Sequence, residues 1–244
     1  MLEKRLNGNQ LKLIAVLSMV IDHCGYILFC GALGGSWETA AQYPRLRMVY
    51  VISHLLGRIA FPIFAYLLVE GFFHTRSRKN YILRMGSFAL LSEIPFNLFV
   101  AGRLGYPGHQ NVFFTFFIGL CMMAATEGIR RRVFGEFGLV LQLLVVTAAS
   151  GLAWVLCVDY QFYGIMLIAI FYWFREKPEW QCLFGFLWQM NCDVEWFSRA
   201  GLLISFLLLY QYNGERGKRG FGYAFYLFYP AHLLVLSWVY ALIF

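Results

Sequence analysis

Residues 11–33 read LKLIAVLSMVIDHCGYILFCGAL, and this stretch decides the class of fold. The run is largely apolar, and its charged and histidine residues are Lys12, Asp22 and His23. An α-helix needs about 20 consecutive apolar residues to cross the hydrocarbon core of a bilayer. Because the run has no small-residue cleavage site and carries Asp22 and His23, we expect a retained first transmembrane helix, not a signal peptide.

The rest of the chain has the same character. Of its 244 residues, 60% are hydrophobic and only 14% are charged, whereas a soluble domain carries about 25% charged residues. We therefore predict an all-α fold, a polytopic transmembrane helical bundle that forms a single domain over residues 1–244. The net charge of +7 does not indicate nucleic-acid binding, because the basic residues stand in short clusters between apolar runs. The expected partner is the lipid bilayer.

Nine apolar runs predict about nine spans, within a range of eight to ten. Three of the runs are short for a bilayer core of about 30 Å, so each of them could be a tilted span, a partial span or a re-entrant segment. Thirteen Lys and Arg residues fall in one set of alternate loops and four in the other, which predicts a cytoplasmic N-terminus. The runs are 11–33, 48–73, 81–101, 111–129, 136–158, 160–174, 180–192, 198–212 and 221–243, with 160–174, 180–192 and 198–212 as the short ones.

Lys12, Asp22 and His23 are the first candidates for function, because a charge inside a bilayer costs roughly 3 kcal/mol on insertion scales. Lys12 and His23 are eleven residues apart, so they lie on one helix face about 16 Å from each other. His23 suits general-base catalysis, since the ordinary pKa of imidazole is near neutral pH. The structural alternatives are a snorkelling Lys12 and a His23 that only bridges helices by a hydrogen bond.

Arg58 and Glu93 are two further charges within apolar runs. Each lies about ten to twelve residues into its run, so the two share an approximate depth, and an ion pair between them is the simplest way to satisfy both. That pair is either structural or part of a site. Pro95 follows Glu93 and can bend its helix. His54 is nearer the outer surface, and we expect it to be interfacial.

Other polar residues suggest the two ends of a site. His23, Arg58, Glu93 and His232 share a depth, which predicts a polar intramembrane cavity. Basic residues at the cytoplasmic mouth suit an anionic cofactor, and Asn111 is also a plausible helix N-cap. The predicted substrate-side residues are His109, Gln110, Asn111, Asp159 and His232, and the predicted cofactor-binding residues are Lys12, Arg76, Arg78 and Lys79.

The sequence lacks the motifs of several common kinds of enzyme. It has no P-loop, no G-x-S-x-G elbow and no H-E-x-x-H, which disfavours phosphoryl transfer and zinc proteolysis. The six cysteines form no close pair of the C-x2-C kind, so we predict no metal site.

Five ordered segments resemble the TraX family, and together they cover most of the chain. They are LKLIAVLSMVIDH, LLGRIAFPIFAYLLVEGFFHTRSRKNYILR, SEIPFNL, HQNVFFT and the tail YNGERG…YLFYPAHLLVL. Residues 133–200 match no motif of the family. Its best-known member acetylates the N-terminus of a conjugative pilin, and the family is grouped with transmembrane acyltransferases that draw acyl groups from cytoplasmic acyl-CoA.

This resemblance implies roles for particular residues. The superfamily has a basic residue, ten intervening residues and then a catalytic histidine on its first helix, and Lys12 and His23 match that spacing. His23 would be the catalytic base and Lys12 a supporting or cofactor-binding residue, although arginine is common where Lys12 stands. The resemblance also implies acetyl-CoA or another acyl-CoA as donor, and a multi-pass protein of the bacterial cytoplasmic (inner) membrane.

The expected reaction is an acyl transfer with His23, Asp22, Arg58 and Glu93 as the catalytic set. His23, oriented by Asp22 or another carboxylate, removes a proton from an amine or hydroxyl of the acceptor. The acceptor then attacks the thioester directly while Arg58 supports the developing negative charge, and a covalent acyl-histidine is a variant. The acceptor is unknown, and a pilin-like peptide or an envelope glycan would suit.

Two other functions stay open at this point. A proton-coupled transporter would use the same midplane charges, and solute flux without thioester consumption would indicate it. A membrane scaffold in pilus or envelope assembly would use them only to specify helix packing. Charge-neutral replacements at Arg58 and Glu93 would then leave its function unchanged.

Overall fold

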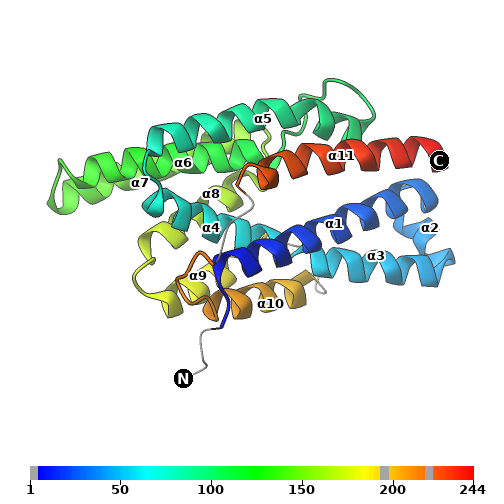
Figure 1. Ribbon diagram of the computed structural model, residues 1–244, viewed down its shortest axis with the longest axis horizontal. Coiled ribbons are helices and arrows are strands. Elements are labelled where there is room, and N and C mark those ends of the chain that lie inside the picture. Colours follow the sequence, from blue (N-terminus) through cyan, green and yellow to red (C-terminus); the bar gives the residue numbers. More distant parts are fainter. Residues whose placement is uncertain (1–4, 193–197, 218–221) are drawn as a thin grey trace. The chain divides into compact units, whose positions relative to one another are not determined.

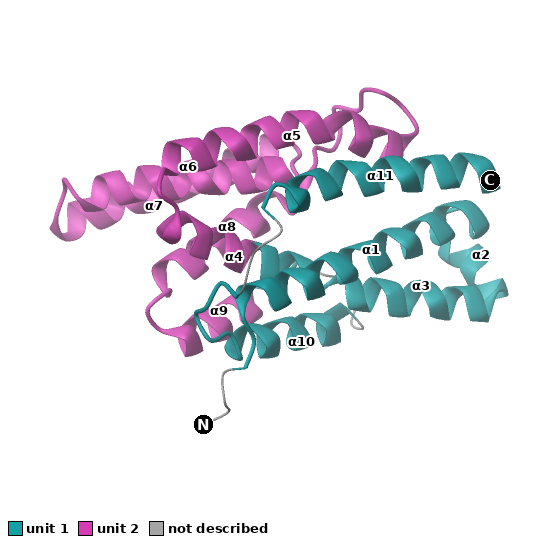
Figure 2. Ribbon diagram, in the orientation of Figure 1, with its two compact units in different colours: residues 1–64, 189–244 teal, residues 65–188 magenta. Residues whose placement is uncertain are grey.

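The computed structural model describes residues 5–192, 198–217 and 222–244 (Figure 1). The regular elements in these residues are helices, and two isolated bridges join Leu6 to Tyr212 and Gln110 to Val158. The chain divides into two compact units, residues 1–64 with 189–244 and residues 65–188 (Figure 2). The first unit therefore brings both ends of the sequence together.

Helix α1 organises the first unit. It packs against α3 and α11, and α10 packs against α3. Lys12 of α1 lies over Phe225 of α11, and His23 contacts His232, so the two helices run parallel (Figure 1). The helices of this unit are α1 (Gly8–Ala32), α2 (Trp37–Gln42), α3 (Pro44–Gly57), the first residues of α4 (Ala60–His74), α10 (Ser198–Tyr210) and α11 (Ala224–Ile243).

The start of α1 is fixed by local sequence. The side chain of Asn7 accepts hydrogen bonds from the N–H groups of Asn9 and Gln10, and the Gln10 side chain accepts one from the N–H of Asn7. Such a capping box satisfies N–H groups that have no partner within the helix. The N–H of Gly8 also donates to the carbonyl of Glu215 at 2.8 Å, which joins this helix start to the segment before α11.

The helical stretch 44–74 is interrupted at residues 58 and 59, where the apolar run 48–73 led us to expect a single span. Pro62 has no N–H to donate to the Arg58 carbonyl, and its ring clashes with that group. Other carbonyls beside the break accept from serines of neighbouring helices: Leu56 from Ser18 at 2.7 Å and Ile59 from Ser205 at 3.1 Å. A break at membrane depth is tolerated where neighbouring side chains satisfy such groups.

Helix α6 is the centre of the second unit. It packs against α5, α7 and α8, and α7 also packs against α8. Ile165, Leu167 and Ile168 of α8 are fully buried. Gly119 allows the close approach of α6 and α8, because a Cβ there would lie 2.6 Å from Cδ1 of Ile168. The helices of this unit are the rest of α4, α5 (Arg78–Ala101), α6 (Val112–Arg130), α7 (Gly135–Val155), α8 (Gln161–Trp173) and α9 (Pro178–Gln189).

Within the described part of the chain, five helical stretches are long and apolar enough to cross a membrane: α1, α3 with α4, α6, α7 and α11. Helices α8 and α10 are apolar but shorter. The expected all-helical membrane protein is confirmed. The parallel course of α1 and α11 is what an odd number of crossings requires, but the count of about nine and the cytoplasmic N-terminus stay predictions. Three of the thirteen basic residues counted in one set of loops, Lys4, Lys218 and Arg219, lie outside the described residues.

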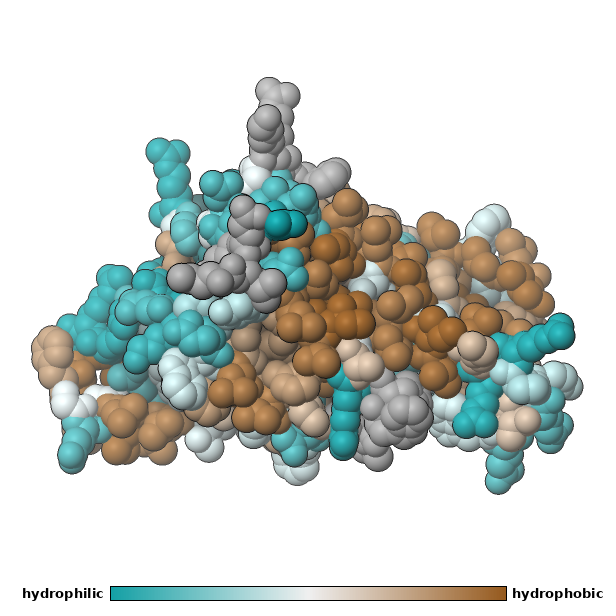
Figure 3. Space-filling model, turned by 90° about the horizontal axis from the view of Figure 1, so that it is seen from below, coloured by the Kyte–Doolittle hydropathy of each residue, from teal (hydrophilic) through white to brown (hydrophobic). Residues whose placement is uncertain are grey.

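Large apolar side chains on the surface agree with a lipid environment. Leu144, Trp154 and Val155 of α7 are 58%, 62% and 69% exposed. Figure 3 shows a broad area of hydrophobic side chains on the face that it draws. Exposed apolar surfaces of this extent mark interaction sites, and on long apolar helices the natural partner is lipid.

We predict that Gly201→Ala destabilises the first unit. A Cβ at Gly201 of α10 would overlap the backbone carbonyl of Leu55 and lie 3.1 Å from the Cβ of Arg58. Overpacking of this kind costs about 1–3 kcal/mol, and it should lower the melting temperature in detergent. The matched control is Gly151→Ala in α7, where a Cβ meets open space; equal melting temperatures for the two variants would contradict this packing.

Candidate functional site

Asp22, His54 and Arg58 form a hydrogen-bonded chain between α1 and the end of α3. Nδ1 of His54 lies 3.0 Å from Oδ1 of Asp22, and Nε2 of His54 contacts Nη2 of Arg58. The carboxylate can only accept and the guanidinium can only donate. His54 therefore donates to Asp22 and accepts from Arg58, which links a half-buried positive charge to a half-buried negative one.

Close helix packing makes this chain possible. A Cβ at Gly57 would overlap the carboxyl group of Asp22, so only glycine lets α3 approach α1 at this height. Arg58 follows directly as the C-cap residue of α3, beside the break before α4. The side chains of Asp22 and His54 are 26% and 18% exposed, and partners are needed for charges with so little access to solvent.

His23 contacts a second histidine, His232 of α11. Nδ1 of His23 lies 2.8 Å from Nε2 of His232, and the rings are stacked at 6° with centroids 5.1 Å apart. Nδ1 of His232 lies 3.0 Å from the carbonyl oxygen of Phe228. A carbonyl only accepts, so His232 donates from Nδ1 and accepts at Nε2. His23 must then donate from Nδ1, which makes its Nε2 an acceptor nitrogen.

Lys12 lies on the same face of α1 as His23. Its ammonium group is 5.6 Å from the centroid of the Phe225 ring on α11. Phe225 and His232 are seven residues, or about two turns, apart on α11. The shared face that the eleven-residue spacing predicts is therefore present, with one basic residue and one histidine along the α1–α11 contact.

These contacts correct the expected partner of His23. We expected Asp22 or another carboxylate to orient it, but the Asp22 carboxylate binds His54 and the residue that contacts His23 is a histidine. Adjacent residues of an α-helix point about 100° apart, so Asp22 reaches α3 while His23 reaches α11. The orienting group for His23 is His232, which the sequence analysis placed with the substrate-side residues. The expected shared depth of His23 and His232 is confirmed by their contact.

Glu93 has its own partner in the second unit. Its Oε2 accepts a hydrogen bond from Nδ2 of Asn111 at 2.6 Å, and Asn111 also donates to the carbonyl of Ala89 at 2.9 Å. Oδ1 of Asn111 accepts from the N–H of Phe113 at 3.1 Å, so the expected N-cap is confirmed. The expected pair of Glu93 with Arg58 would join the two units and stays a prediction.

Three more residues predicted on the substrate side, His109, Gln110 and Asp159, also lie in this unit, whereas His232 lies in the first. Gln110 and Asp159 join two loops, because the N–H of Asp159 donates to the Gln110 carbonyl at 2.9 Å. Nε2 of His109 lies 3.7 Å from Oδ1 of Asp159. This ion pair raises the pKa of His109, although partial burial opposes the rise. The loops before α6 and α8 thus carry one polar cluster.

The predicted cofactor-binding residues of the second unit separate into two kinds. Arg76 and Lys79 are exposed, whereas Arg78 contacts the buried carboxylate of Glu127 at 3.9 Å. Glu127 was not among the residues predicted from the sequence, and neither was the linking role of His54. A signal existed for His54, since it precedes Arg58 by one helical turn and i,i+4 residues contact each other.

Comparisons with known proteins cover almost the whole chain. A family model described as TraX protein matches residues 7–240. The chain is 27% identical over 249 residues to a probable fimbrial assembly protein FimC, serogroup H1, of Dichelobacter nodosus, with 93% of each chain covered. No solved structure matches. The matched range contains Lys12, His23 and His232.

The His109–Asp159 pair should make stability depend on pH. Because the pKa of His109 is raised in the folded state, the pair stabilises the fold fully at pH below the ordinary histidine pKa of about 6.5. This stabilisation is lost as the pH rises through the folded-state pKa of His109. We predict that wild type melts above Asp159→Asn near pH 5 and that the difference shrinks toward pH 9. A difference that stays constant over this range would contradict the assignment.

Proposed function

This chain belongs to the TraX family, and on that premise we propose that it is an integral-membrane acyltransferase. It would move an acyl group, most simply acetyl, from cytoplasmic acyl-CoA to an amine or hydroxyl of an acceptor. The observation that carries the proposal is the chain of contacts from the Phe228 carbonyl through His232 to His23. It sets the tautomer of a membrane histidine so that Nε2 can take a proton.

His23 acts as general base in this proposal. As the amine or hydroxyl of the acceptor attacks the thioester carbonyl carbon, Nε2 of His23 takes the proton that the attacking atom loses. The C–S bond breaks, and the CoA sulfur leaves with the proton that His23 returns. His232 supports the charged imidazole, because its Nε2 still accepts from Nδ1 of His23. The backbone carbonyl and second histidine thus orient the base as the carboxylate does in a Ser-His-Asp triad.

Arg58 supplies the positive charge in this proposal. Negative charge develops on the thioester oxygen during attack, and a guanidinium held in place stabilises it without reorganisation. His54 and Asp22 hold Arg58, and Asp22 is the neighbour of His23 on α1. They are therefore positioning residues for Arg58, a role that differs from the one the sequence suggested for Asp22.

Lys12 is suited to a phosphate of the donor. Lysine binds phosphate as a point charge, and Lys12 shares with His23 the face of α1 that meets α11. The pantetheine arm of CoA is long and flexible, so a head near Lys12 and a thioester near His23 are compatible with three helical turns, about 16 Å. The part of Arg76 and Lys79 in binding the donor stays a prediction.

For the acceptor we propose a pilin-like subunit in the bacterial inner membrane. The proposal is supported by the fimbrial assembly protein among the relatives, whose name concerns the assembly of fimbriae. A scaffold that assists assembly without catalysis is the second candidate, supported by the same name. Consumption of the thioester separates the two functions.

We predict that His23→Ala abolishes acyl transfer, with a loss of at least about 100-fold, because it removes the general base. Release of free CoA from acetyl-CoA by native membranes that contain the chain and its acceptor measures the activity. His74→Ala is the matched control, since His74 ends α4 with 73% of its side chain exposed. The two variants should be expressed and melt alike.

His232→Ala should lower the rate less than His23→Ala, since His232 orients the base and does not take the proton. Full CoA release by the His23→Ala variant would contradict the proposal. Loss of pilus assembly in that variant without any CoA release by wild type would favour the scaffold.

A further inference from the structure

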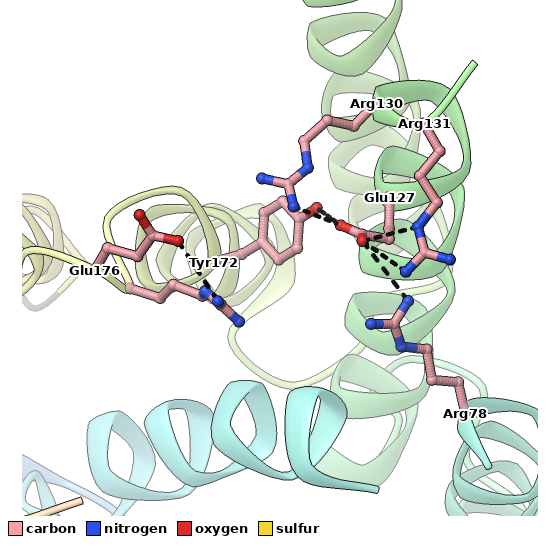
Figure 4. Close-up of polar contacts among 7 residues, drawn as sticks. Arg78, Glu127, Arg130, Arg131, Tyr172 and Glu176 are labelled. Carbon is pink, nitrogen blue, oxygen red and sulfur yellow. Dashed lines mark hydrogen bonds and ion pairs between the residues drawn. The ribbon is translucent and has the colours of Figure 1, made fainter. Parts of the chain in front are cut away.

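A cluster of arginines surrounds one buried carboxylate in the second unit (Figure 4). Glu127 lies in the last turn of α6, and its side chain is 7% exposed. Oε1 accepts from Nε and Nη2 of Arg131 at 3.1 and 3.0 Å, and Nη1 of Arg78 lies 3.9 Å away. Oε2 accepts from the Tyr172 hydroxyl at 2.8 Å and lies 3.4 Å from Nη2 of Arg130. A single negative charge thus faces three guanidinium groups.

A fourth arginine extends the cluster through aromatic rings. The guanidinium of Arg175 lies 3.8 Å from the centroid of Phe73, and the Phe73 ring stacks on that of Tyr172 at 5.6 Å. Arg78 lies 4.4 Å from the centroid of Phe72. The carboxylate of Glu176 lies 3.5 Å from Arg175 but is 80% exposed, and such a surface pair contributes little. Four arginines against two glutamates leave the cluster with a net charge of +2.

The arginines are fixed on one side and accessible on the other. Each guanidinium has five N–H donors, and the contacts with Glu127 use one or two of them. The side chains of Arg130 and Arg131 are 60% and 66% exposed, and those of Arg78 and Arg175 are 32% and 36% exposed. Glu127 therefore holds Arg78, Arg130 and Arg131 in place while their side chains stay partly accessible to solvent. Groups that are already held in place lose less conformational entropy when a ligand binds.

The position of the cluster points to phosphate. It lies at the end of α6, a helix that qualifies as a membrane span, and therefore at a membrane–water boundary, where lipid phosphates are found. Arginine binds phosphate through two parallel hydrogen bonds, and clustered arginines are its usual protein partners. Arg76, Lys79 and Arg132 are exposed near it in sequence and add to the positive field.

We propose that Arg78, Arg130, Arg131 and Arg175 form a binding site for a phosphate group, preorganised by Glu127 and Tyr172. The phosphate is that of an anionic lipid headgroup or of a soluble phosphorylated nucleotide. The site exists whether or not the chain transfers acyl groups.

Binding of two probes to the purified full chain in neutral detergent tests the site. The lipid probe is dioctanoyl phosphatidylglycerol, and the soluble probe is adenosine 3′,5′-bisphosphate. Whichever probe binds, Arg131→Gln should lower its affinity by about tenfold, which corresponds to the loss of one charge-assisted hydrogen bond. The matched control is Arg103→Gln, which removes the same charge from an exposed loop at the far end of α5, about 36 Å along a helix of 24 residues.

Each outcome decides the proposal. Binding of the lipid probe alone, or of the nucleotide alone, identifies the source of the phosphate. Either result supports the site if Arg131→Gln lowers the affinity for that probe and Arg103→Gln changes the affinity less than twofold. If Arg131→Gln does not fold, Arg130→Gln replaces it, because Arg130 has one contact with Glu127 at 3.4 Å. The proposal is overturned if neither probe binds wild type, or if the cluster and control variants bind alike.

Discussion

A polar or charged group within a bilayer must find its partner in the protein, and two adjacent residues of α1 show how this chain meets the requirement. Asp22 points to α3 and satisfies Arg58 through His54, while His23 points to α11 and binds His232. The broken helix obeys the same rule, since Ser18 and Ser205 satisfy carbonyls beside the break. Both ends of the chain are thereby tied into one unit.

The same requirement connects structure to chemistry. His232 donates its Nδ1 proton to a backbone carbonyl and can only accept from His23, so the tautomer of His23 follows from a backbone group one helical turn from His232. A base with a fixed tautomer is useful for proton transfer, but it needs a charge nearby to support the reacting oxygen. Arg58 at the helix break is suited to that role. The buried carboxylate of Glu127 arranges arginines by the same logic at the end of α6.

The sequence predicted most of the fold and part of the site. Apolar runs predicted the helices, and the spacing of Lys12 and His23 predicted their shared face, because both depend only on helix periodicity. Asn111 was predicted as an N-cap because that position has a local signature. The partners of Asp22 and His23 could not be predicted, since they depend on which helices lie on either side of α1. Likewise Glu127 stands out only once α5 and α8 bring Arg78 and Tyr172 to it.

The central claim is that the α1–α11 face holds an acyl thioester beside His23. A cryo-electron microscopy structure of the full chain with a thioether analogue of acetyl-CoA tests it most directly. The account predicts that density for the analogue runs from Lys12 toward His23 and ends with the acyl group beside that histidine. An analogue that binds with its acyl group away from α1, or that does not bind at all, would contradict it.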